Sequence, residues 1–514
     1  MNSVVIVGAG PAGLAAADAA LRAGAEVTLL DAAAQPGGQF HRMLPIAYAA
    51  THPERVQHGW SAFEGLRRRV LEHPRCAWWS ESTVWAIEDG PRVHVLRGLV
   101  DGTGRARHVL EPDALVLATG AHDRVLPFPG WQLPGVFSAG AAQALAKGER
   151  VAVGERVVVA GSGPFLLPVT AALSEAGSRV LAVLEANSAR TVLRGWGSWP
   201  RESGSHRRGS WAGESGSGGR GSRAGESGSR GRGSLAGELG GKAGEWGSLW
   251  RGSRAGELGG NAWELVGKVG ELLGYAVGQA RHRVPYRMGR AVIAARGDGR
   301  VEEVVVARLR ADWSVLPGSE RTVAVDAVCV SHGFSPQLEL AVAAGCALSD
   351  TGFVDVGETQ MTTVTGVYAA GEITGIAGAR AAAAEGAVAG WCAVGREPSA
   401  AELRRVAAGR AFAGRLARAH PIGAGWSGWL RPDTVICRCE ETSYAALREA
   451  AADPSMMDSR ALRLATRAGL GPCQARICGP TVAELTGSRA AHRRPIAQPI
   501  RLGELAEPPL QKED

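Results

Sequence analysis

Four cysteines near the C-terminal end have a spacing that can hold an inorganic centre. Cys437 and Cys439 are separated by one residue, Cys473 and Cys478 by four, and 33 residues lie between the two pairs. Four thiolates can bind an iron–sulfur cluster. Structural zinc also accepts four, usually through pairs spaced by two to four residues. The short first pair favours an iron–sulfur cluster over zinc, and four thiols without a metal are the third alternative.

A glycine-rich turn near the N-terminus has the residues that bind the phosphates of a dinucleotide. The sequence GAGPAG contains Gly8, Gly10, Pro11, Ala12 and Gly13, between an apolar run and an alanine-rich helical pattern. The first glycine permits a tight turn, the second lets a pyrophosphate approach the backbone, and the third lets helix and strand pack closely. The start of the helix supplies N–H groups and partial positive charge. Asp31, at the end of the next predicted strand, can accept hydrogen bonds from a ribose.

A second turn of the same kind departs from this pattern at one position. Gly161 and Gly163 follow the apolar run VVVAG, but Leu166 stands where the third glycine is expected. A leucine there should push helix and strand apart or reshape the phosphate loop. Glu185 ends the following strand and can bind a ribose with a free 2′-hydroxyl, while its charge would repel a 2′-phosphate. We therefore predict NAD(H), another adenine nucleotide held structurally, or an unused site, and we exclude NADP.

For the remaining cysteines and for two histidines we predict packing roles rather than catalytic ones. No closely spaced cysteine pair lies near either nucleotide site, which argues against a disulfide relay. We expect small buried side chains at Cys76, Cys329, Cys346 and Cys392. His41 and His122 lie beside the nucleotide motifs and could touch a flavin or an interface, but polar packing is the favoured role. No hydrolytic Ser/His/Asp or Cys/His set stands out.

The strands and helices that must position these groups can be predicted from the spacing of apolar residues along the sequence. Strands are predicted at residues 4–7 and 26–30, with a helix between them, and again at residues 156–161 and 179–184. Two such βαβ units predict an α/β protein with two dinucleotide-binding domains. Downstream we expect strand patterns within 291–307, strands at 324–330 and 366–370, and helices at 377–390 and 401–420. Short helices at 443–451, begun by Thr442 or Ser443, and at 459–468 separate the cysteine pairs.

The segment 196–262 interrupts the second βαβ domain. It contains 21 glycines and 12 serines among 67 residues and repeats units such as RGSWAGESG. Such a composition buries too little apolar surface to fold, so we predict a flexible insertion rather than a solenoid. Helical structure should resume at 263–280. The insertion carries +4 of the net charge of +7. Because every repeat also carries Glu, nucleic-acid binding is disfavoured.

Composition sets further bounds. The 514 residues are 45% hydrophobic and 21% charged, as in globular proteins. No stretch approaches the roughly 18 apolar residues of a membrane span. The apolar run at residues 4–7 follows Met1 without a basic segment, so no secretory signal is predicted. We therefore expect a cytoplasmic protein with reduced cysteines.

Two further segments resemble those of flavoproteins of the glutathione-reductase type. LVLATG at 115–120 and GVYAAGE at 366–372 are apolar runs that end in Thr119-Gly120 and Gly371-Glu372. The resemblance implies FAD in the first domain, with an acid near the ribityl chain. The usual acid is Asp, and here Glu372 moves the charge by about one carbon. We also predict cofactor contacts at Gly38 and Gln39.

The cysteine spacing resembles the [2Fe–2S] domain of the bacterioferritin-associated ferredoxin type. That resemblance implies all four cysteines as cluster ligands. The runs at 118–147, 326–346 and 373–379 resemble the flavin-containing subunit of two-subunit amine-oxidising dehydrogenases. This family includes the A subunits of opine oxidases, the B subunit of hydrogen cyanide synthase and the α subunits of dye-linked proline or hydroxyproline dehydrogenases.

The resemblance implies a partner. A subunit of D-amino-acid-oxidase type, with its own FAD, would oxidise a C–N bond. This chain would then pass electrons through flavin and cluster to an acceptor. The alternative is a self-sufficient NADH-dependent reductase. We expect an FAD domain at 1–120 and 325–395, a second nucleotide domain at 121–324, a linker with a helix at 396–430, a small helical [2Fe–2S] domain at 431–490 and a tail at 491–514.

Overall fold

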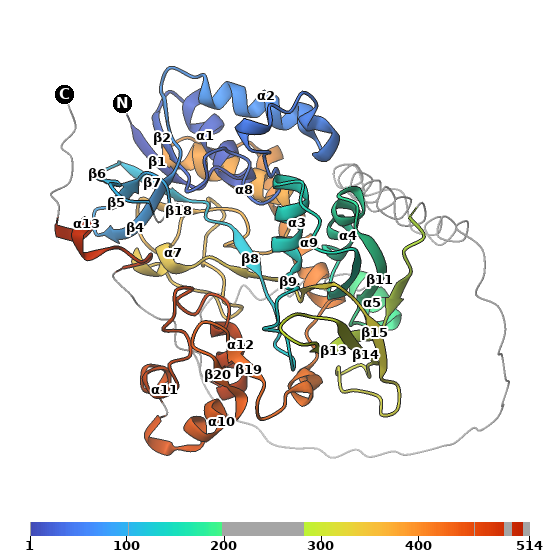
Figure 1. Ribbon diagram of the computed structural model, residues 1–514. Coiled ribbons are helices and arrows are strands. Elements are labelled where there is room, and N and C mark those ends of the chain that lie inside the picture. Colours follow the sequence, from blue (N-terminus) through green and yellow to red (C-terminus); the bar gives the residue numbers. More distant parts are fainter. Residues whose placement is uncertain (1, 101, 198–281, 457, 488–495, 507–514) are drawn as a thin grey trace, which may run out of the picture. The chain divides into compact units, whose positions relative to one another are not determined.

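The computed structural model describes residues 2–100, 102–197, 282–456, 458–487 and 496–506 (Figure 1). Most of the predicted insertion and the helix predicted at 263–280 lie outside these residues. Trp196 is an exception, because it belongs to helix α5 (Ala189–Gly197) and packs on Phe412. No helix in the described ranges is long and apolar enough to cross a membrane.

The first nucleotide domain is built on a five-stranded parallel sheet. Its strand order is β18-β7-β1-β2-β3, and every neighbouring pair is parallel. The strands are β1 (Ser3–Val7), β2 (Glu26–Leu30), β3 (Cys76–Trp79), β7 (Ala114–Leu117) and β18 (Val367–Ala369). The last strand comes from far down the chain, so the first domain is discontinuous in sequence.

Both faces of this sheet are covered, which explains the uninterrupted apolar run in β1. Val4 and Ile6 face a helical layer of α1 (Pro11–Arg22), α2 (Trp60–Leu71) and α8 (Ala379–Ala393). Val5 and Val7 face the opposite side, because successive side chains of a strand alternate. There they pack against an antiparallel sheet of β4 (Ser82–Glu88), β5 (Arg92–Arg97) and β6 (Ala106–Leu110). Neither α2 nor this antiparallel sheet was predicted.

The second domain repeats the plan with a sheet of order β12-β11-β10-β16-β9. Its strands are β9 (Val136–Ser138), β10 (Arg156–Gly161), β11 (Arg179–Glu185), β12 (Tyr286–Met288) and β16 (Ala327–Ser331). One face packs on α3 (Ala139–Gly148) and α4 (Leu166–Glu175). The other packs on an antiparallel sheet of β13 (Arg290–Arg296), β14 (Glu303–Arg308) and β15 (Arg321–Ala324). Since β16 pairs with β10 and β9, the boundary expected at 325 falls inside the second domain's sheet, and the chain returns to the first domain only after Ser331.

A short antiparallel pair joins the two domains. It consists of β8 (Ala121–Asp123) and β17 (Phe334–Pro336), which are the segments that follow β7 and β16. Helix α7 (Glu339–Ala343) follows β17. The pair starts at the carboxyl edges of both parallel sheets, the edge at which such sheets bind ligands.

The C-terminal region begins with α9 (Ala400–Ala419), which starts at a capping box formed by Ser399 and Glu402. The cysteine region contains β19 (Val435–Cys437), β20 (Thr442–Ser443), α10 (Tyr444–Ala452), α11 (Ser459–Thr466) and α12 (Gly479–Thr486). Ser443 accepts the N–H of Ala446 and is the N-cap of α10. Helix α13 (Leu502–Ala506) ends the described chain and packs on the sheet β4–β6 through the ion pair Arg105–Glu504.

Candidate functional site

The first glycine turn has the geometry that its sequence predicts. Gly8 has φ +106°, and a Cβ there would overlap the carbonyl oxygen of Ala118. A Cβ on Gly13 would overlap the carbonyl oxygen of Gly8, so this glycine lets α1 pack against the turn. A Cβ on Gly10 would meet only the α-carbon of Gly38, at 3.8 Å. The space beside Gly10 is therefore open, as the approach of a pyrophosphate requires.

Helix α1 presents its N-terminal end to this space. It begins at Pro11, with Gly10 as N-cap and no acidic residue in its first turn. Proline at the first helical position removes an N–H that would have had no partner. The remaining N–H groups and the helix dipole favour an anion at this end, so the turn fits a dinucleotide pyrophosphate.

Asp31 lies at the end of β2 and is bound to the backbone. Its Oδ2 accepts the N–H of Ala9 at 2.6 Å, and its Oδ1 accepts the N–H of Ala33 at 2.8 Å. Burial raises the pKa of Asp31, and these two hydrogen bonds oppose the shift. The carboxylate thus fixes the glycine turn, a role in addition to the ribose contact that the sequence predicts.

The other predicted residues of this site come from the ends of β7 and β18 and from one loop. Gly120 has φ +74° and open space around it, and Thr119 donates to the carbonyl of Gln337 at 2.8 Å. Glu372 accepts the N–H of Gly378 at 2.7 Å. Gly38 lies against Gly10, whereas Gln39 is exposed. The strand ends bring Thr119 and Gly120 to the same sheet edge as the glycine turn.

Two carboxylates of this region, Glu385, which is buried, and Asp123, which is half-buried, are not predicted from the sequence. Glu385, on α8, accepts the N–H of Gly371 at 2.9 Å and the hydroxyl of Thr374 at 2.6 Å, and burial raises its pKa. Asp123, on β8, accepts the N–H of Gly140 and the hydroxyl of Ser331, and burial raises its pKa too. Glu385 could have been noticed as the only acidic residue among the small residues of its helix, whereas Asp123 carries no such sign.

The second glycine turn is longer than the first, in agreement with the reshaped loop that Leu166 predicts. Helix α1 begins one residue after Gly10, but α4 begins at Leu166, three residues after Gly163. Leu166 is fully buried among the apolar residues of the sheet and helices. The leucine therefore anchors α4 in the core and lengthens the loop in front of it.

Glu185 has no exposed surface, and the chain itself surrounds it. Its Oε2 accepts the N–H of Gly163 at 2.8 Å, and its Oε1 accepts the N–H of Asn187 at 2.9 Å. The imidazole Nδ1 of His420, directly after α9, lies 3.3 Å from Oε2. A ribose could reach this carboxylate only after these groups separate.

The fold brings the four C-terminal cysteines together. Their thiols interact in the order Cys439–Cys473–Cys478–Cys437. A hydrogen bond with the thiol of Cys478 and hydrogen bonds from backbone N–H groups lower the pKa of Cys437 to about 6. The same kinds of contact lower the pKa of Cys473 to about 5. The pKa of Cys478 is raised, first by its hydrogen bonds to these two thiols. The pKa of Cys439, the exposed thiol of the four, is raised by partial desolvation and by its neighbours Cys473 and Cys437.

The backbone around these thiols supports a thiolate site. Cys437 receives the N–H groups of Gly469, Glu440 and Cys439, and Cys473 those of Ile477 and Ala475. A Cβ on Gly471 would overlap the Cβ of Cys439, so only glycine fits there. Among the described residues no three His, Cys, Asp or Glu side chains are spaced as ligands of a single ion. The four sulfur donors and the backbone N–H groups beside them are of the kinds that hold an iron–sulfur cluster, although the spacing of the side chains is not that of a formed metal site.

The other cysteines are thiols that burial keeps protonated. Cys329 and Cys346 are buried, and Cys76 and Cys392 are half-buried. Burial raises the pKa of all four, to about 11 for Cys76.

His41 has the packing role favoured by the sequence. Its ring stacks on Phe63 with centroids 4.0 Å apart, and its Nε2 lies 3.0 Å from the carbonyl of His58. Burial lowers the pKa of His41 to about 4.

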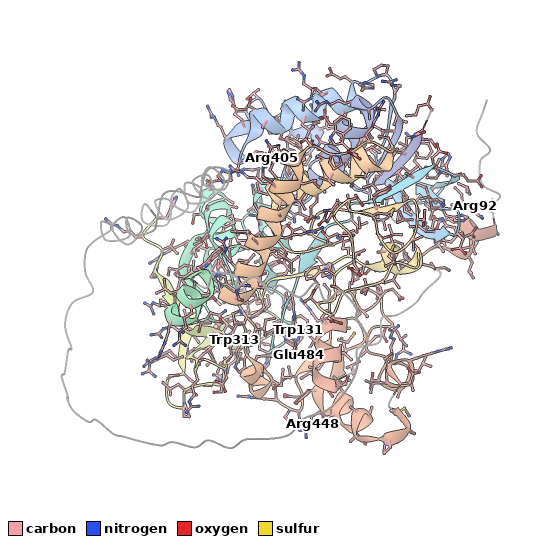
Figure 2. The ribbon with its side chains drawn as sticks, turned by 180° about the vertical axis from the view of Figure 1, so that it is seen from behind. Arg92, Trp131, Trp313, Arg405, Arg448 and Glu484 are labelled. Carbon is pink, nitrogen blue, oxygen red and sulfur yellow. The ribbon has the colours of Figure 1, made fainter. Side chains whose placement is uncertain are left out.

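Several contacts connect the cysteine region to the nucleotide domains. His122 Nε2 lies 2.8 Å from the carbonyl oxygen of Arg476. Trp131 donates its indole N–H to the carbonyl of Val435, and Arg124 pairs with Glu484. Trp131 and Glu484 are labelled in Figure 2, one in the second domain and the other on α12. His122 therefore contacts the loop that carries Cys473 and Cys478.

Comparisons with known proteins agree with this architecture. Residues 2–194 and 276–386 match the family described as pyridine nucleotide-disulphide oxidoreductase. The A subunit of an opine oxidase from Rhizobium meliloti is 30% identical over 98% of this chain and 87% of its own length. The HcnB subunit of hydrogen cyanide synthase from Pseudomonas aeruginosa is 29% identical over 92% of this chain and 90% of its own length.

A solved structure shows the same fold. The L-proline dehydrogenase from P. horikoshii aligns with a TM-score of 0.59 at 17% identity, covering 98% of this chain and 79% of that one. The open glycine turn, the parallel sheets and the family match lead to one conclusion. The chain belongs to the pyridine nucleotide-disulphide oxidoreductase family and is an FAD-dependent oxidoreductase.

Proposed function

We propose that this protein is the electron-transferring subunit of an amine or imino-acid dehydrogenase, with FAD in the first domain and a [2Fe–2S] cluster on Cys437, Cys439, Cys473 and Cys478. The observation that carries the proposal is the convergence of the four cysteines, two of which, Cys473 and Cys478, flank a loop that His122 contacts at the edge of the flavin domain. A flavin site and four clustered thiols in one chain suit electron transfer better than hydrolysis or binding alone.

The names of the relatives support the substrate class. Two are subunits, of an opine oxidase and of hydrogen cyanide synthase, and the solved structure is an L-proline dehydrogenase. For this chain we propose opines, proline, hydroxyproline or glycine as candidates. A partner subunit of D-amino-acid-oxidase type would oxidise the C–N bond. A separate acceptor would receive the electrons, and a reducing compartment such as the cytoplasm would keep the thiols free.

When bound, FAD would supply two-electron chemistry and a [2Fe–2S] cluster would supply one-electron transfer. The chain's residues hold these groups. Gly8, Gly10 and the start of α1 bind the pyrophosphate, while Asp31 fixes their turn. Residues at the ends of β7 and β18 would contact the rest of the flavin.

The polypeptide around the thiols has a tuning role. Hydrogen bonds to cluster sulfurs and solvent exposure set the reduction potential of an iron–sulfur centre. Cys437 is buried, whereas Cys439 is exposed. We propose that an acceptor would approach this site from the side of Cys439, because its side chain is the exposed one of the four.

The decisive experiment is the cofactor content of the full-length protein, made alone and with a neighbouring oxidase-type subunit. Flavin, iron and acid-labile sulfide are measured, together with the electron paramagnetic resonance spectrum after reduction. We expect one flavin per chain, bound in the first domain, and two irons per chain, bound in the cysteine region. Cys473→Ser should remove the iron and leave the flavin, while the matched control Cys392→Ser should keep both. Stoichiometric zinc without iron would refute the proposal.

The partner and substrate need a separate assay. The two-subunit complex is offered proline, hydroxyproline, opines and glycine with an artificial dye as acceptor. We expect dye reduction by at least one of them with the complex and none with the isolated chain. Equal activity of the isolated chain would contradict the need for a partner.

A further inference from the structure

His122 lies just beyond the carboxyl edge of the flavin domain's sheet, on the strand pair that joins the two nucleotide domains. It follows Gly120 by two residues and Thr119 by three, on β8, the segment that continues from β7 beyond the sheet. Its backbone is held by pairing with Ser335 of β17. The side chain is therefore placed by two short strands that both begin at the carboxyl edges of the parallel sheets.

The ring of His122 reaches the loop between Cys473 and Cys478. Its Nε2 lies 2.8 Å from the carbonyl oxygen of Arg476. A carbonyl oxygen only accepts hydrogen bonds, so Nε2 must carry the proton and donate. The hydrogen bond thus joins β8, at the edge of the flavin domain, to the backbone between Cys473 and Cys478.

Arg476 holds the same loop through its side chain. Its Nε lies 2.9 Å from a carboxylate oxygen of Glu339 on α7. One guanidinium nitrogen donates to the carbonyl of Cys473 at 3.2 Å, and the other to the carbonyl of Ala497 at 2.9 Å. The loop is consequently fixed to the flavin domain by its backbone at His122 and by its side chain at Glu339.

We propose that His122 is a positioning residue that, with Arg476, docks the Cys473–Cys478 loop onto the flavin domain and so forms the contact across which electrons pass from flavin to cluster. This inference rests on the proposed function. Further contacts of the cysteine region, Trp131–Val435, Arg438–Gln132 and Arg124–Glu484, involve residues outside this loop. They hold the region in place without touching the backbone between the cysteines.

The test compares two replacements of nearly equal size. In His122→Gln the amide nitrogen can occupy the place of Nε2 and donate to the carbonyl of Arg476, whereas the shorter His122→Asn cannot reach it. Glu484→Gln is the control, because it weakens a docking contact away from the loop. Each variant is made in the full-length chain and analysed first for flavin, iron and sulfide.

The first measurement is hydrogen–deuterium exchange of peptides covering residues 470–480, in the complete protein and after removal of iron. Loss of one hydrogen bond should speed exchange about fivefold in His122→Asn. His122→Gln and Glu484→Gln should match the wild type there. Because the metal-free protein is included, this measurement reports on docking even if the chain holds no cluster.

The second measurement follows the cluster spectrum after rapid photoreduction of the flavin. His122→Asn should reduce the cluster at least several-fold more slowly, with an unchanged flavin content and unchanged resonance spectrum, and His122→Gln should restore the rate. Equal exchange and equal rates in His122→Asn and wild type would overturn the inference. A wild type without iron would instead refute the proposed function and leave the exchange result to decide on docking.

Discussion

Gly13 packs so closely on Gly8 that a Cβ at position 13 would overlap the carbonyl oxygen of residue 8. The neighbouring Gly10 has no such contact, since a Cβ there would meet only the α-carbon of Gly38 at 3.8 Å. Gly13 and Gly10, two glycines of one motif, therefore have different structural roles. One serves the packing of helix against strand, and the other leaves room for a ligand.

Replacing these glycines should separate folding from flavin binding. Gly10→Ala should fold like the wild type, because its methyl group enters open space, yet bind flavin at least about tenfold more weakly, a loss of about 1.4 kcal/mol. Gly13→Ala should lower the yield of folded protein. Flavin absorbance and circular dichroism measure the two effects. Full flavin content in Gly10→Ala would contradict the pyrophosphate site.

A methyl group at Gly471 should disturb the cysteine site specifically. In Gly471→Ala the new Cβ would overlap the Cβ of Cys439, so the cysteine backbone must shift. We expect loss of most iron with retention of flavin, measured by metal analysis and absorbance. Gly428→Ala is the matched control in the same region, because nothing lies within 4 Å of its Cβ position. Equal iron in both variants would argue against a cluster at these cysteines.

NADH should not reduce the flavin of the wild-type chain. The carboxylate of Glu185 is fully buried, accepts the N–H of Gly163 and has the ring of His420 beside it, so the ribose position is occupied by the chain. Anaerobic addition of NADH, followed by flavin absorbance, tests this. Rapid bleaching would instead favour the alternative of a self-sufficient NADH-dependent reductase. His420→Ala, which removes the ring beside Gly163, should increase adenine-nucleotide binding in calorimetry.

Acid should destabilise the fold partly through His332. This ring is buried, its Nδ1 accepts the N–H of Leu126 at 3.3 Å, and burial together with Arg124 lowers the pKa of His332 to about 3. The unfolded chain, with a pKa near 6.5, binds one proton more between pH 6.5 and 3. Stability therefore falls as the pH falls through this range, by about 1.4 kcal/mol per pH unit.

The variant His332→Asn should remove this proton uptake while its amide oxygen can still accept a hydrogen bond. Urea unfolding at pH 7.5, 6.5, 5.5 and 4.5 should show a shallower loss of stability than in the wild type. The exposed His52→Asn serves as the comparison. Parallel pH curves for wild type and His332→Asn would contradict the assignment.

The buried ion pair Arg105–Glu504 should hold the C-terminal helix. The two side chains form a double hydrogen bond at 2.7 and 2.8 Å and are nearly buried. Removing one partner of such a pair costs about 3–5 kcal/mol when the other charge stays buried. Because α13 can separate from the sheet, we expect Glu504→Ala to release residues 496–506, measured as faster proteolysis there. The double variant Arg105→Met with Glu504→Leu should restore protection.

The sequence allowed the parallel sheets to be predicted because their strands are short, apolar and followed by glycine turns. The strand predicted at 26–30 has the observed bounds of β2, and the helices predicted at 443–451 and 459–468 correspond to α10 and α11. The strand of β16 was found but assigned to the wrong domain, since apolar strands of two parallel sheets look alike and only their pairing with β10 distinguishes them.

The site was less predictable where long-range packing decides a residue's role. Asp31 was expected to face a ribose, but its bond to Ala9 depends on how β2 lies beside the turn. The burial of Glu185 depends on His420, 235 positions further along the chain. Glu385 and Asp123 act on glycines of other elements. Such long-range contacts leave no recognisable pattern in the local sequence. The replacement of a motif glycine by Leu166, in contrast, can be recognised from the sequence alone.

The discontinuity of the first domain has a consequence for its biosynthesis. Strand β18 and helix α8 complete the sheet and the helical layer that residues 3–30 begin, and glycines of α8 lie directly on the backbone of α1 at Ala12 and Ala16. When these first residues leave the ribosome, the partners of their apolar face have not been synthesised. The second domain can fold in the meantime. We therefore expect the N-terminal strands to need protection from aggregation until residue 393 has emerged, and translation arrest before that point to leave them unfolded.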